Sequence, residues 1–400
     1  MRRWRAKDGD ERDRPLICTV STVRDTTANV VRFVDRNLAA GVDHMFLFLE
    51  GSPDELRETS HALQDYSSYA TPVRVGPRYW NPKRPAGLNQ RQVTNASFVN
   101  CLLAPFPAAQ WLFHIDGDEC LDIDRDHLLA LPPDVPCVRL QTREAVSRAV
   151  WDGEVDLFKR QLDHEELCLL TVLGVISGPA NGRYFHGHLM GKPGLRPDVD
   201  LRPRIHKVLD HNDVEIQPHE HDALHVLHYE SYSGEEFVRK WLAHLSSGPT
   251  PKFGAAKDQL RAAITAVLRT PVLTEEQKHD LLHELYLRRV EDDLPTLDRL
   301  GLLVTPDPAR HRHRPNKFTR EDAKAVRQLI ELLRRVDKGG LMYGADGPKP
   351  VELLRDARKQ LDEGTHLAEV MDRFTAAREN DLEAAVTIQS PHQSGTDRRA

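Results

Sequence analysis

Two aspartates one residue apart, Asp116 and Asp118, follow an apolar run in the segment WLFHIDGDECLDID (111–124), and Glu119 comes directly after them. Carboxylates this close repel one another and resist burial unless a cation lies among them. Oxygen ligands without thiolates favour Mg²⁺ or Mn²⁺, ions that also bind substrate phosphates. The spacing therefore predicts that Asp116 and Asp118 hold such an ion. A solvated acidic turn is the alternative, because this short motif also occurs by chance.

The last two acids of the segment have a simpler explanation. Asp122 and Asp124 stand just before DHLLAL, which has the apolar spacing of a short helix. Aspartate is a common helix cap, so we expect these two side chains to cap that helix or to lie in a solvated turn. The role of Glu119 stays open.

Strand and helix patterns alternate ahead of the acidic motif, and these elements must position it. The expected strands are 16–23, 44–50, 71–77 and 110–116, and the expected helices between them are 28–40, 52–66 and 89–104. Such short alternation predicts an α/β fold with a parallel, doubly wound sheet. Ligands of such sheets bind outside the carboxyl ends of the strands, where Asp116, Asp118 and Glu50 would lie.

The rest of the chain divides by pattern. Residues 132–230 are irregular and rich in β-forming residues, with strands expected at 136–142, 170–177 and 224–229 and a helix at 235–245. We therefore expect four parts: a disordered arm at 1–14, an α/β domain at 15–245, a helical region at 246–384 and a disordered tail at 385–400.

Composition restricts the class of protein. The chain has 400 residues, of which 40% are hydrophobic and 29% are charged, and its formal net charge is −6, which does not favour a nucleic-acid partner. Its five cysteines are scattered and form no CxxC pair, as in proteins of reducing compartments. No apolar run approaches the ~20 residues of a membrane-spanning helix. We expect a cytoplasmic protein without a transmembrane segment.

Several segments in order resemble one family. TVRDTTANVVRFVDRNLAAGVDHMFLFLE, LEGSPDE, NQRQVTNASFVNCLL with WLFHIDGDECL, GHLMGKPGLRP with IHKV, and LHYESYSGEEFVRKW resemble successive motifs of the family-2-type glycosyltransferases with a GT-A fold. The closest resemblance is to the bacterial branch similar to the family-92 (DUF23-like) group. It covers roughly residues 15–245. It implies a GT-A-like sheet with a Rossmann-like nucleotide-binding half and a β-rich acceptor half.

The resemblance also implies an activity and a set of site residues. The activity is transfer of a sugar from a nucleotide-diphosphate sugar to an acceptor hydroxyl, assisted by Mn²⁺ or Mg²⁺; the acceptor could be a saccharide, a lipid-linked molecule or a small molecule. By position, the metal ligands would be Asp116 and Asp118, completed by His206 or His228. The nucleotide-sugar contacts would come from Arg24, Asp25, Glu50, Asp116, Lys192 and Arg196.

Such a transfer also needs a carboxylate to take the acceptor proton. The candidates are Glu165 and Glu166, with Asp163 and Glu144 as further choices. Asp25 could instead cap the helix that follows it.

Two rival interpretations stay open. His219, His221 and His225 could form a zinc site, although no cysteine joins them. The whole chain could also be a non-catalytic protein that keeps the GT-A fold and binds a nucleotide or a carbohydrate. Where the family usually has a lysine–asparagine–glutamate triplet, this chain has Arg24, Asp25 and Thr26 and thus lacks the glutamate.

Overall fold

The structure is a computed structural model that describes residues 14–81, 83–197, 200–210, 212–246, 255–306, 313–341 and 350–388. The disordered segments expected at the two ends of the chain lie outside the described residues, apart from Arg14 and residues 385–388. Most of the linker at the start of the expected helical region also lies outside them.

Strands and helices alternate in the first part of the chain, as predicted. The elements are β1 Leu16–Val23, α1 Thr27–Ala39, β2 His44–Leu49, α2 Pro53–Ala62, β3 Ala70–Arg74, α3 Leu88–Leu103 and β4 Ala109–His114. The start of α2 shows why the local sequence folds in this way. Ser52 accepts a hydrogen bond from the Glu55 backbone N–H, and the Glu55 carboxylate accepts one from the Ser52 N–H. This reciprocal capping box begins the helix at Pro53.

The sheet is mostly parallel, and its central order is β3-β2-β1-β4-β8-β6. Strands β1 to β4 run parallel, while β8 (Lys192–Leu195) runs antiparallel between β4 and β6 (Cys137–Ala145). The remaining elements of this half are β5 Glu119–Ile123, α4 Arg125–Ala130, β7 Phe158–Lys159, α5 His164–Val172, α6 Asn181–Tyr184, β9 Arg202–Pro203, β10 Val208–Leu209, β11 His219–His228 and α7 Gly234–Ser246. The predicted α/β class, with a GT-A-like mostly parallel sheet, is confirmed.

One expected strand is wrong. Residues 170–172 are the last residues of helix α5, and residues 173–177 form turns and bends after it. The helix is fixed at its start, where Asp163 caps the backbone of Glu166 and the Glu166 carboxylate caps the backbone of Asp163. Leu167 and Leu170 then lie three residues apart on the buried face, a spacing that suits a helix.

Apolar residues on the two faces of the sheet form separate cores. Alternation along β1 sends Leu16, Cys18 and Val20 to one face and Ile17 to the other. Helix α3 covers the first face and helix α1 the second. The sheet is therefore doubly wound, and its strand ends are held between two packed layers.

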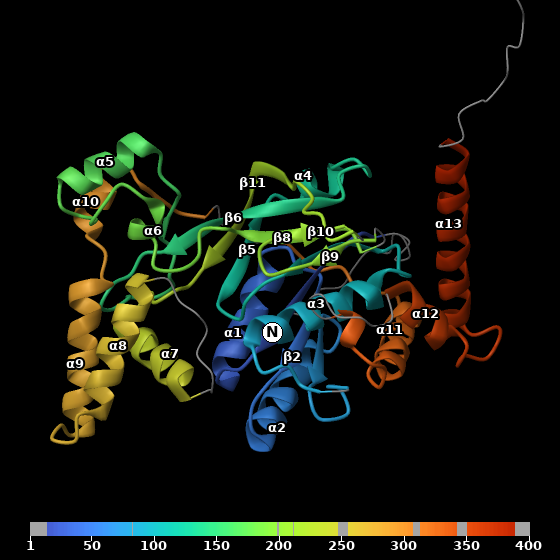
Figure 1. The fold of residues 1–400 in the computed structure, drawn as a ribbon, viewed down its shortest axis with the longest axis horizontal. Helices are drawn as coiled ribbons and strands as arrows, with labels where there is room; N and C mark the ends of the chain where they lie inside the picture. The colour runs from blue at the N-terminus through green and yellow to red at the C-terminus, as the bar shows by residue number, and fades with distance from the viewer. Residues whose placement is uncertain are drawn as a thin grey trace, which may run out of the picture.

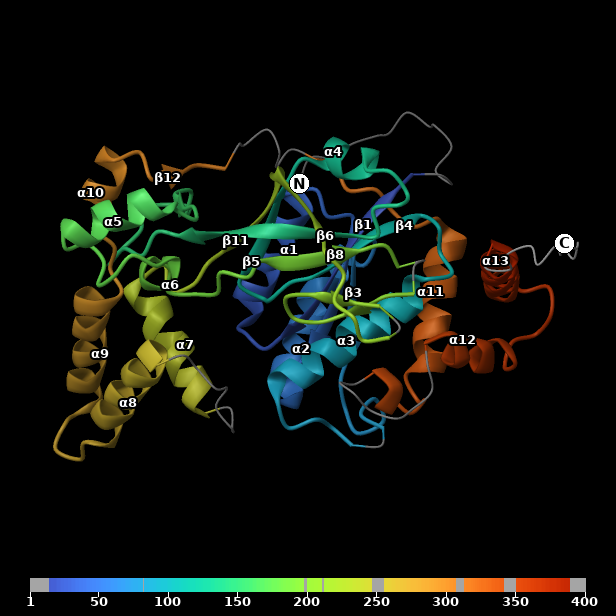
Figure 2. The same cartoon turned by 45° about the horizontal axis from the view of Figure 1, so that its top comes forward.

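The elements after residue 245 pack in two different parts of the molecule. Its elements are α8 Ala255–Arg269, α9 Glu275–Arg289, α10 Leu294–Arg299, β12 Leu303–Val304, α11 Arg320–Leu333, α12 Pro350–Arg358 and α13 His366–Ile388. Helices α8 and α9 pack with α7, α10 packs near α5, and β12 pairs with β7. Helices α11 to α13 pack against α3 on the opposite side of the molecule (Figures 1 and 2). Both groups therefore complete cores that begin within residues 15–245.

Within the ranges that the structure describes, no helix combines the length and the apolar character needed to cross a bilayer.

Candidate functional site

Asp116 lies in the turn after β4, at the carboxyl edge of the parallel strands. Its two oxygens are held by different elements: Gln92 of α3 donates from Nε2 to Oδ1 at 2.5 Å, and Lys192 donates from Nζ to Oδ2 at 2.6 Å. Lys192 is completely buried. It reaches this edge because β8 runs antiparallel to β4 and begins just beyond the end of that strand. The structure thus brings two of the predicted residues, Asp116 and Lys192, into direct contact.

Asp118 lies at the same edge, in a second group of charges. Lys240 of α7 donates from Nζ to Asp118 Oδ2 at 2.5 Å and to Glu230 Oε2 at 2.5 Å. His228, at the end of β11, places Nε2 3.7 Å from Asp118 Oδ2 and 3.5 Å from Glu230 Oε2. Asp118, His228 and Glu230 therefore offer three donor atoms within 4.8 Å of one another.

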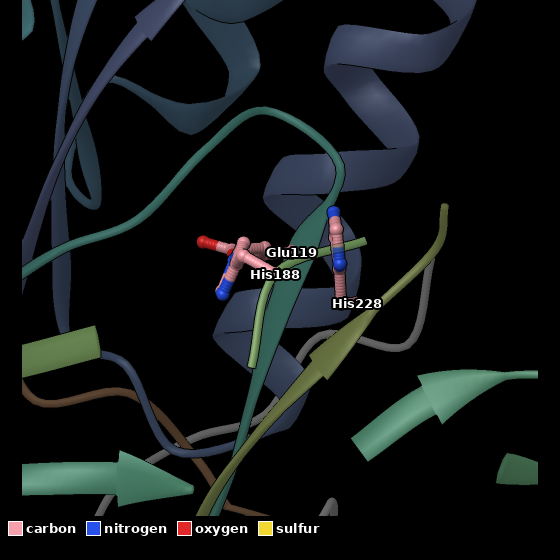
Figure 3. Close-up of side chains that lie close together, drawn as sticks. All are labelled: Glu119, His188 and His228. Carbon is pink, nitrogen blue, oxygen red and sulfur yellow. The ribbon is translucent and has the colours of Figure 1, made fainter. Parts of the chain in front are cut away.

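Glu119 belongs to a third group and is completely buried on β5. His188 places Nε2 2.7 Å from Glu119 Oε1, and Lys192 places Nζ 3.4 Å from Glu119 Oε2. Because β5 and β11 are antiparallel, His228 is the direct cross-strand partner of Glu119. Figure 3 shows Glu119, His188 and His228 side by side, and the two imidazole rings stack at 4.7 Å between centroids. These residues form a second group of donor atoms within 4.8 Å.

A glycine and a buried acid position the loop that carries His188. A Cβ at Gly187 would lie 2.4 Å from His228 Cε1, so only glycine allows this close approach. Glu144 accepts hydrogen bonds from the backbone N–H groups of His186 at 2.8 Å and Gly187 at 2.5 Å. The Glu144 carboxylate thus holds the loop in place.

Charges in these groups shift one another's pKa values. Burial by itself would raise the pKa of Asp118, but Lys240 and His228 outweigh it and hold this pKa well below its ordinary value. Burial opposes ionisation of Glu119 as well, yet the charge of Lys192 lowers its pKa. Burial would lower the pKa of His228, but the hydrogen bond to Asp118 raises it. The acids are therefore ionised at neutral pH, in the form that binds cations.

Glu50 lies at the end of β2, as expected, but its carboxylate already binds arginine. Arg91 donates from Nε and Nη2 to the two Glu50 oxygens at 2.7 and 3.1 Å, and Arg84 Nη2 lies 3.0 Å from Oε1. Arg91 and Gln92 are consecutive on α3, so one helix start holds both Glu50 and Asp116.

Asp25 contacts both the start of α1 and a residue of α7. Its Oδ1 accepts hydrogen bonds from the Thr26 N–H at 2.7 Å and the Asn29 side chain at 2.9 Å, at the start of α1. Arg239 of α7 also binds both Asp25 oxygens, at 2.8 and 3.2 Å. Arg24 is exposed beside it. The ion pair of Asp25 with Arg239 thus connects the end of β1 to α7, the helix that carries Lys240.

His206 lies near the cluster but in neither donor group. Its Nδ1 donates to the Gly191 carbonyl at 2.8 Å, and its ring is 4.7 Å from that of His188. Burial and the charge of Lys192 lower its pKa to about 4, so the ring is neutral at physiological pH. Of the two histidines that the resemblance implied as metal ligands, His228 is the one whose donor atom joins the acids.

Arg196 is not brought to the cluster. Its guanidinium donates to the carbonyls of Val135 at 3.1 Å and Leu131 at 2.8 Å and stacks on Trp111 at 4.4 Å. Because β8 is antiparallel, Lys192 and Arg196 fall at opposite ends of this strand, and Arg196 lies beside the start of β6. The structure therefore places the two cations apart.

Glu165 and Glu166 are also placed elsewhere. Both lie in the first turn of α5, which packs with α6 and α10 in a separate small core (Figure 1). Glu165 is exposed, while Glu166 is paired with Arg160 at 2.6 Å and caps its own helix. That hydrogen-bonded arginine lowers the Glu166 pKa. Neither acid contacts the residues around Asp118.

The remaining polar residues agree only in part with the expectations. Asp124 caps α4, as predicted, but Asp122 is buried on β5 and pairs with Arg143 at 2.6 Å, so it is not a solvated turn residue. The expected zinc ligands do not converge: His219 and His221 stack with a ring of α4, and the described residues include no donor group that joins them to His225.

Four contributors were not identified from the sequence: Gln92, His188, Glu230 and Lys240. The motifs that carried the resemblance contained all four, but no spacing pointed to them. The pairing of β5 with β11 supplies the missing information, because it places the residues after His228 beside Asp118. The backbone N–H of Tyr229 donates to the Asp118 carbonyl at 2.9 Å, which fixes this register.

The residues present fit a divalent cation. The cluster brings four carboxylates (Asp116, Asp118, Glu119 and Glu230) together with the ammonium groups of Lys192 and Lys240. The Nδ1 atoms of His188 and His228 are buried without a hydrogen-bond partner. A donor set of carboxylate oxygens and imidazole nitrogens suits Mn²⁺ or another transition ion better than Mg²⁺, which prefers oxygen alone.

The fold and the site together define an α/β protein with a GT-A-like sheet whose carboxyl edge carries a buried cluster of acids, lysines and histidines. No family model matches the chain, and no curated protein matches it.

Solved structures overlap with the chain in part. The 4-diphosphocytidyl-2C-methyl-D-erythritol synthase of Anaerococcus prevotii shares 11% identity over 46% of this chain and 72% of its own, with a TM-score of 0.22. HddC of Yersinia pseudotuberculosis shares 13% identity over 46% and 77%, with a TM-score of 0.24. A glycosyltransferase involved in the glycosylation of the major capsid of PBCV-1 shares 9% over 46% and 61%, with a TM-score of 0.20. Overlaps of this extent define neither a family nor an activity.

Proposed function

We propose that this protein is a metal-dependent glycosyltransferase that moves a sugar from a nucleotide-diphosphate sugar to an acceptor hydroxyl. The observation that carries the proposal is the cluster of Asp116, Asp118 and Glu119 with Glu230 and His228 at the carboxyl edge of a mostly parallel sheet. Ligands of such sheets bind at this edge. The ordered resemblance of residues 15–245 to family-2-type glycosyltransferases supports the same activity.

Each contact at this edge has a role in the proposal. Asp118, His228 and Glu230 would hold the cation, which, when bound, would neutralise charge on the departing diphosphate. Lys192 and Gln92 fix the orientation of Asp116 beside it. The Glu50–Arg91 pair would lie toward the nucleoside. It stands at the end of β2, which is separated from β4 by β1 on the same edge of the sheet.

Two of the expected roles are not carried forward. Arg196 is used in packing at the other end of β8, and Glu166 is paired with Arg160. The proposal therefore assigns no diphosphate contact to Arg196 and no proton transfer to Glu165 or Glu166.

The test is a thermal-shift screen of UDP- and GDP-sugars with and without Mn²⁺. A ligand at 100 times its Kd stabilises the folded protein by about 2.7 kcal/mol, so a bound sugar nucleotide should raise the melting temperature measurably. Asp118→Asn should abolish the Mn²⁺-dependent part of the shift. The matched control is Asp134→Asn, which removes an exposed acid outside the cluster and should leave the shift unchanged.

A second assay separates catalysis from binding. Release of free nucleoside diphosphate in the presence of saccharide acceptors is expected for a transferase. A thermal shift without any turnover would favour the non-catalytic nucleotide-binding protein instead. If no nucleotide-diphosphate sugar shifts the wild-type protein, both functions are ruled out.

A further inference from the structure

Lys240 and His228 both face the same two carboxylate oxygens, one from Asp118 and one from Glu230. Asp118 Oδ2 and Glu230 Oε2 each lie 2.5 Å from Lys240 Nζ. These oxygens are also the atoms nearest to His228 Nε2, at 3.7 and 3.5 Å. An ion bound by Asp118, His228 and Glu230 would need the oxygens that the ammonium group now occupies.

We propose that Lys240 is a resident counter-cation that competes with the divalent metal for Asp118 and Glu230. This inference rests on the proposed metal site and adds a residue that sets its affinity. A metal that enters displaces the ammonium group, and Lys240 then points away from the two carboxylates.

The surroundings of Lys240 allow this exchange. Its side chain is 23% exposed and Asp118 is 31% exposed, whereas Lys192 is completely buried. The lysine stem has four rotatable bonds, so the ammonium can leave while the helix stays in place. Helix α7 itself is anchored by Phe237 and Trp241, which pack in the core shared with α9.

The charge of Lys240 should weaken the binding of a divalent ion to Asp118 and Glu230. Without Lys240, the ionised carboxylates of Asp118 and Glu230 would share this partly buried site with one positive charge fewer, which favours any cation that can bind there. With Lys240 in place, a divalent ion must first replace an existing ion pair. Lys192 differs, because it donates to Asp116, which belongs to neither donor group, and lies farther, at 3.4 Å, from Glu119.

The first experiment measures Mn²⁺ binding to the full chain by titration calorimetry, in the absence of nucleotide. Lys240→Met should bind Mn²⁺ about tenfold more tightly than the wild type, or better. The matched control is Arg239→Met, which removes the neighbouring cation of the same helix, paired with Asp25 and Glu236 and not with Asp118. Its Mn²⁺ affinity should change less than threefold.

The second experiment needs no variant and so does not depend on how a substitution folds. Reductive methylation followed by mass spectrometry reports how accessible each lysine amine is. Saturating Mn²⁺ should raise the labelling of Lys240 at least threefold. Lys207, which is 39% exposed and pairs with Glu215 away from the cluster, should label equally with and without the metal.

The outcomes distinguish this inference from the proposed function. Equal or weaker Mn²⁺ binding by Lys240→Met, or unchanged Lys240 labelling in the presence of bound Mn²⁺, overturns the competition, while a glycosyltransferase activity can still stand. If the wild type and Lys240→Met both fail to bind Mn²⁺, the competition and the metal part of the proposed function fail together.

Discussion

Two completely buried lysines join the C-terminal helices to the sheet, and their surroundings are opposite. Lys159 of β7 lies 3.0 Å from Glu144 and 3.1 Å from Asp292, which follows α9. Lys338, after α11, donates to the carbonyls of Arg334 and Val336 at 3.0 and 3.2 Å and lies 4.4 Å from the centre of the Tyr79 ring. Burial disfavours the charge of both amines. Carboxylates nevertheless raise the Lys159 pKa, whereas burial lowers the Lys338 pKa to about 8.

The contacts of Lys159 are linked to the candidate site, whereas those of Lys338 support only the fold. Glu144, one partner of Lys159, also binds the backbone of His186 and Gly187, next to His188. Asp292 adds a contact from the α9–α10 connection to the same network. Helices α11 to α13 instead meet α3 through apolar side chains. A substitution in the Lys159 network should therefore weaken metal binding, and a substitution in the core of α11 to α13 should not.

The largest effect is expected for Lys159→Met. It leaves Glu144 and Asp292 buried without their cation, a change that typically costs about 4 kcal/mol. Urea unfolding monitored by circular dichroism measures the loss. The folded fraction should also bind Mn²⁺ more weakly, because the loop that carries His188 is no longer held. Unchanged Mn²⁺ affinity would separate this network from the site.

A smaller effect on stability is expected for Leu329→Ala in α11. This completely buried side chain packs in the core shared with α3, and its truncation leaves a cavity that costs about 3 kcal/mol. The same urea unfolding measures it. Here the folded protein should keep its wild-type Mn²⁺ affinity. A tenfold loss of affinity would show that α11 is coupled to the site through α3.

The smallest effect is a pH dependence that Lys338→Met should remove. With a folded pKa of about 8 and an unfolded value of about 10.4, the unfolded chain holds more protons between these pH values. The contribution of Lys338 to stability therefore rises with pH from about pH 7 upward, by about 1.3 kcal/mol between pH 7 and 9. Parallel unfolding curves of wild type and Lys338→Met at both pH values give the difference. An unchanged slope in the variant would contradict the lowered pKa.

Local sequence was sufficient for much of the fold. The apolar runs of β1, β2 and β4 and the capped start of α2 each carry their own signal, so the parallel half of the sheet could be predicted. The reversal at β8 could not, because Lys192–Leu195 is a short strand that contains proline and glycine. Its direction depends on pairing with β4 and β6, which lie far away in the sequence.

The site residues likewise divide into those that local sequence indicates and those that depend on strand pairing. Asp116 and Asp118 could be found because a buried strand leads directly into them. Lys240 and Glu230 could not, since only the pairing of β11 with β5 brings them to Asp118. Glu166 is one of several acids that the sequence offers as a candidate base. Its neighbour Arg160 and its capping contact decide its actual role.

One core extends from Leu16 of β1 to Met371 of α13. A ribosome adds about 5–20 residues per second, so roughly 20–70 seconds pass between the synthesis of these two residues. During that interval β1 and α3 can assemble, but the apolar face that awaits α11 to α13 has no cover. The nascent chain therefore carries an exposed hydrophobic surface until α11 to α13 have been synthesised, and this is the kind of surface that chaperones bind.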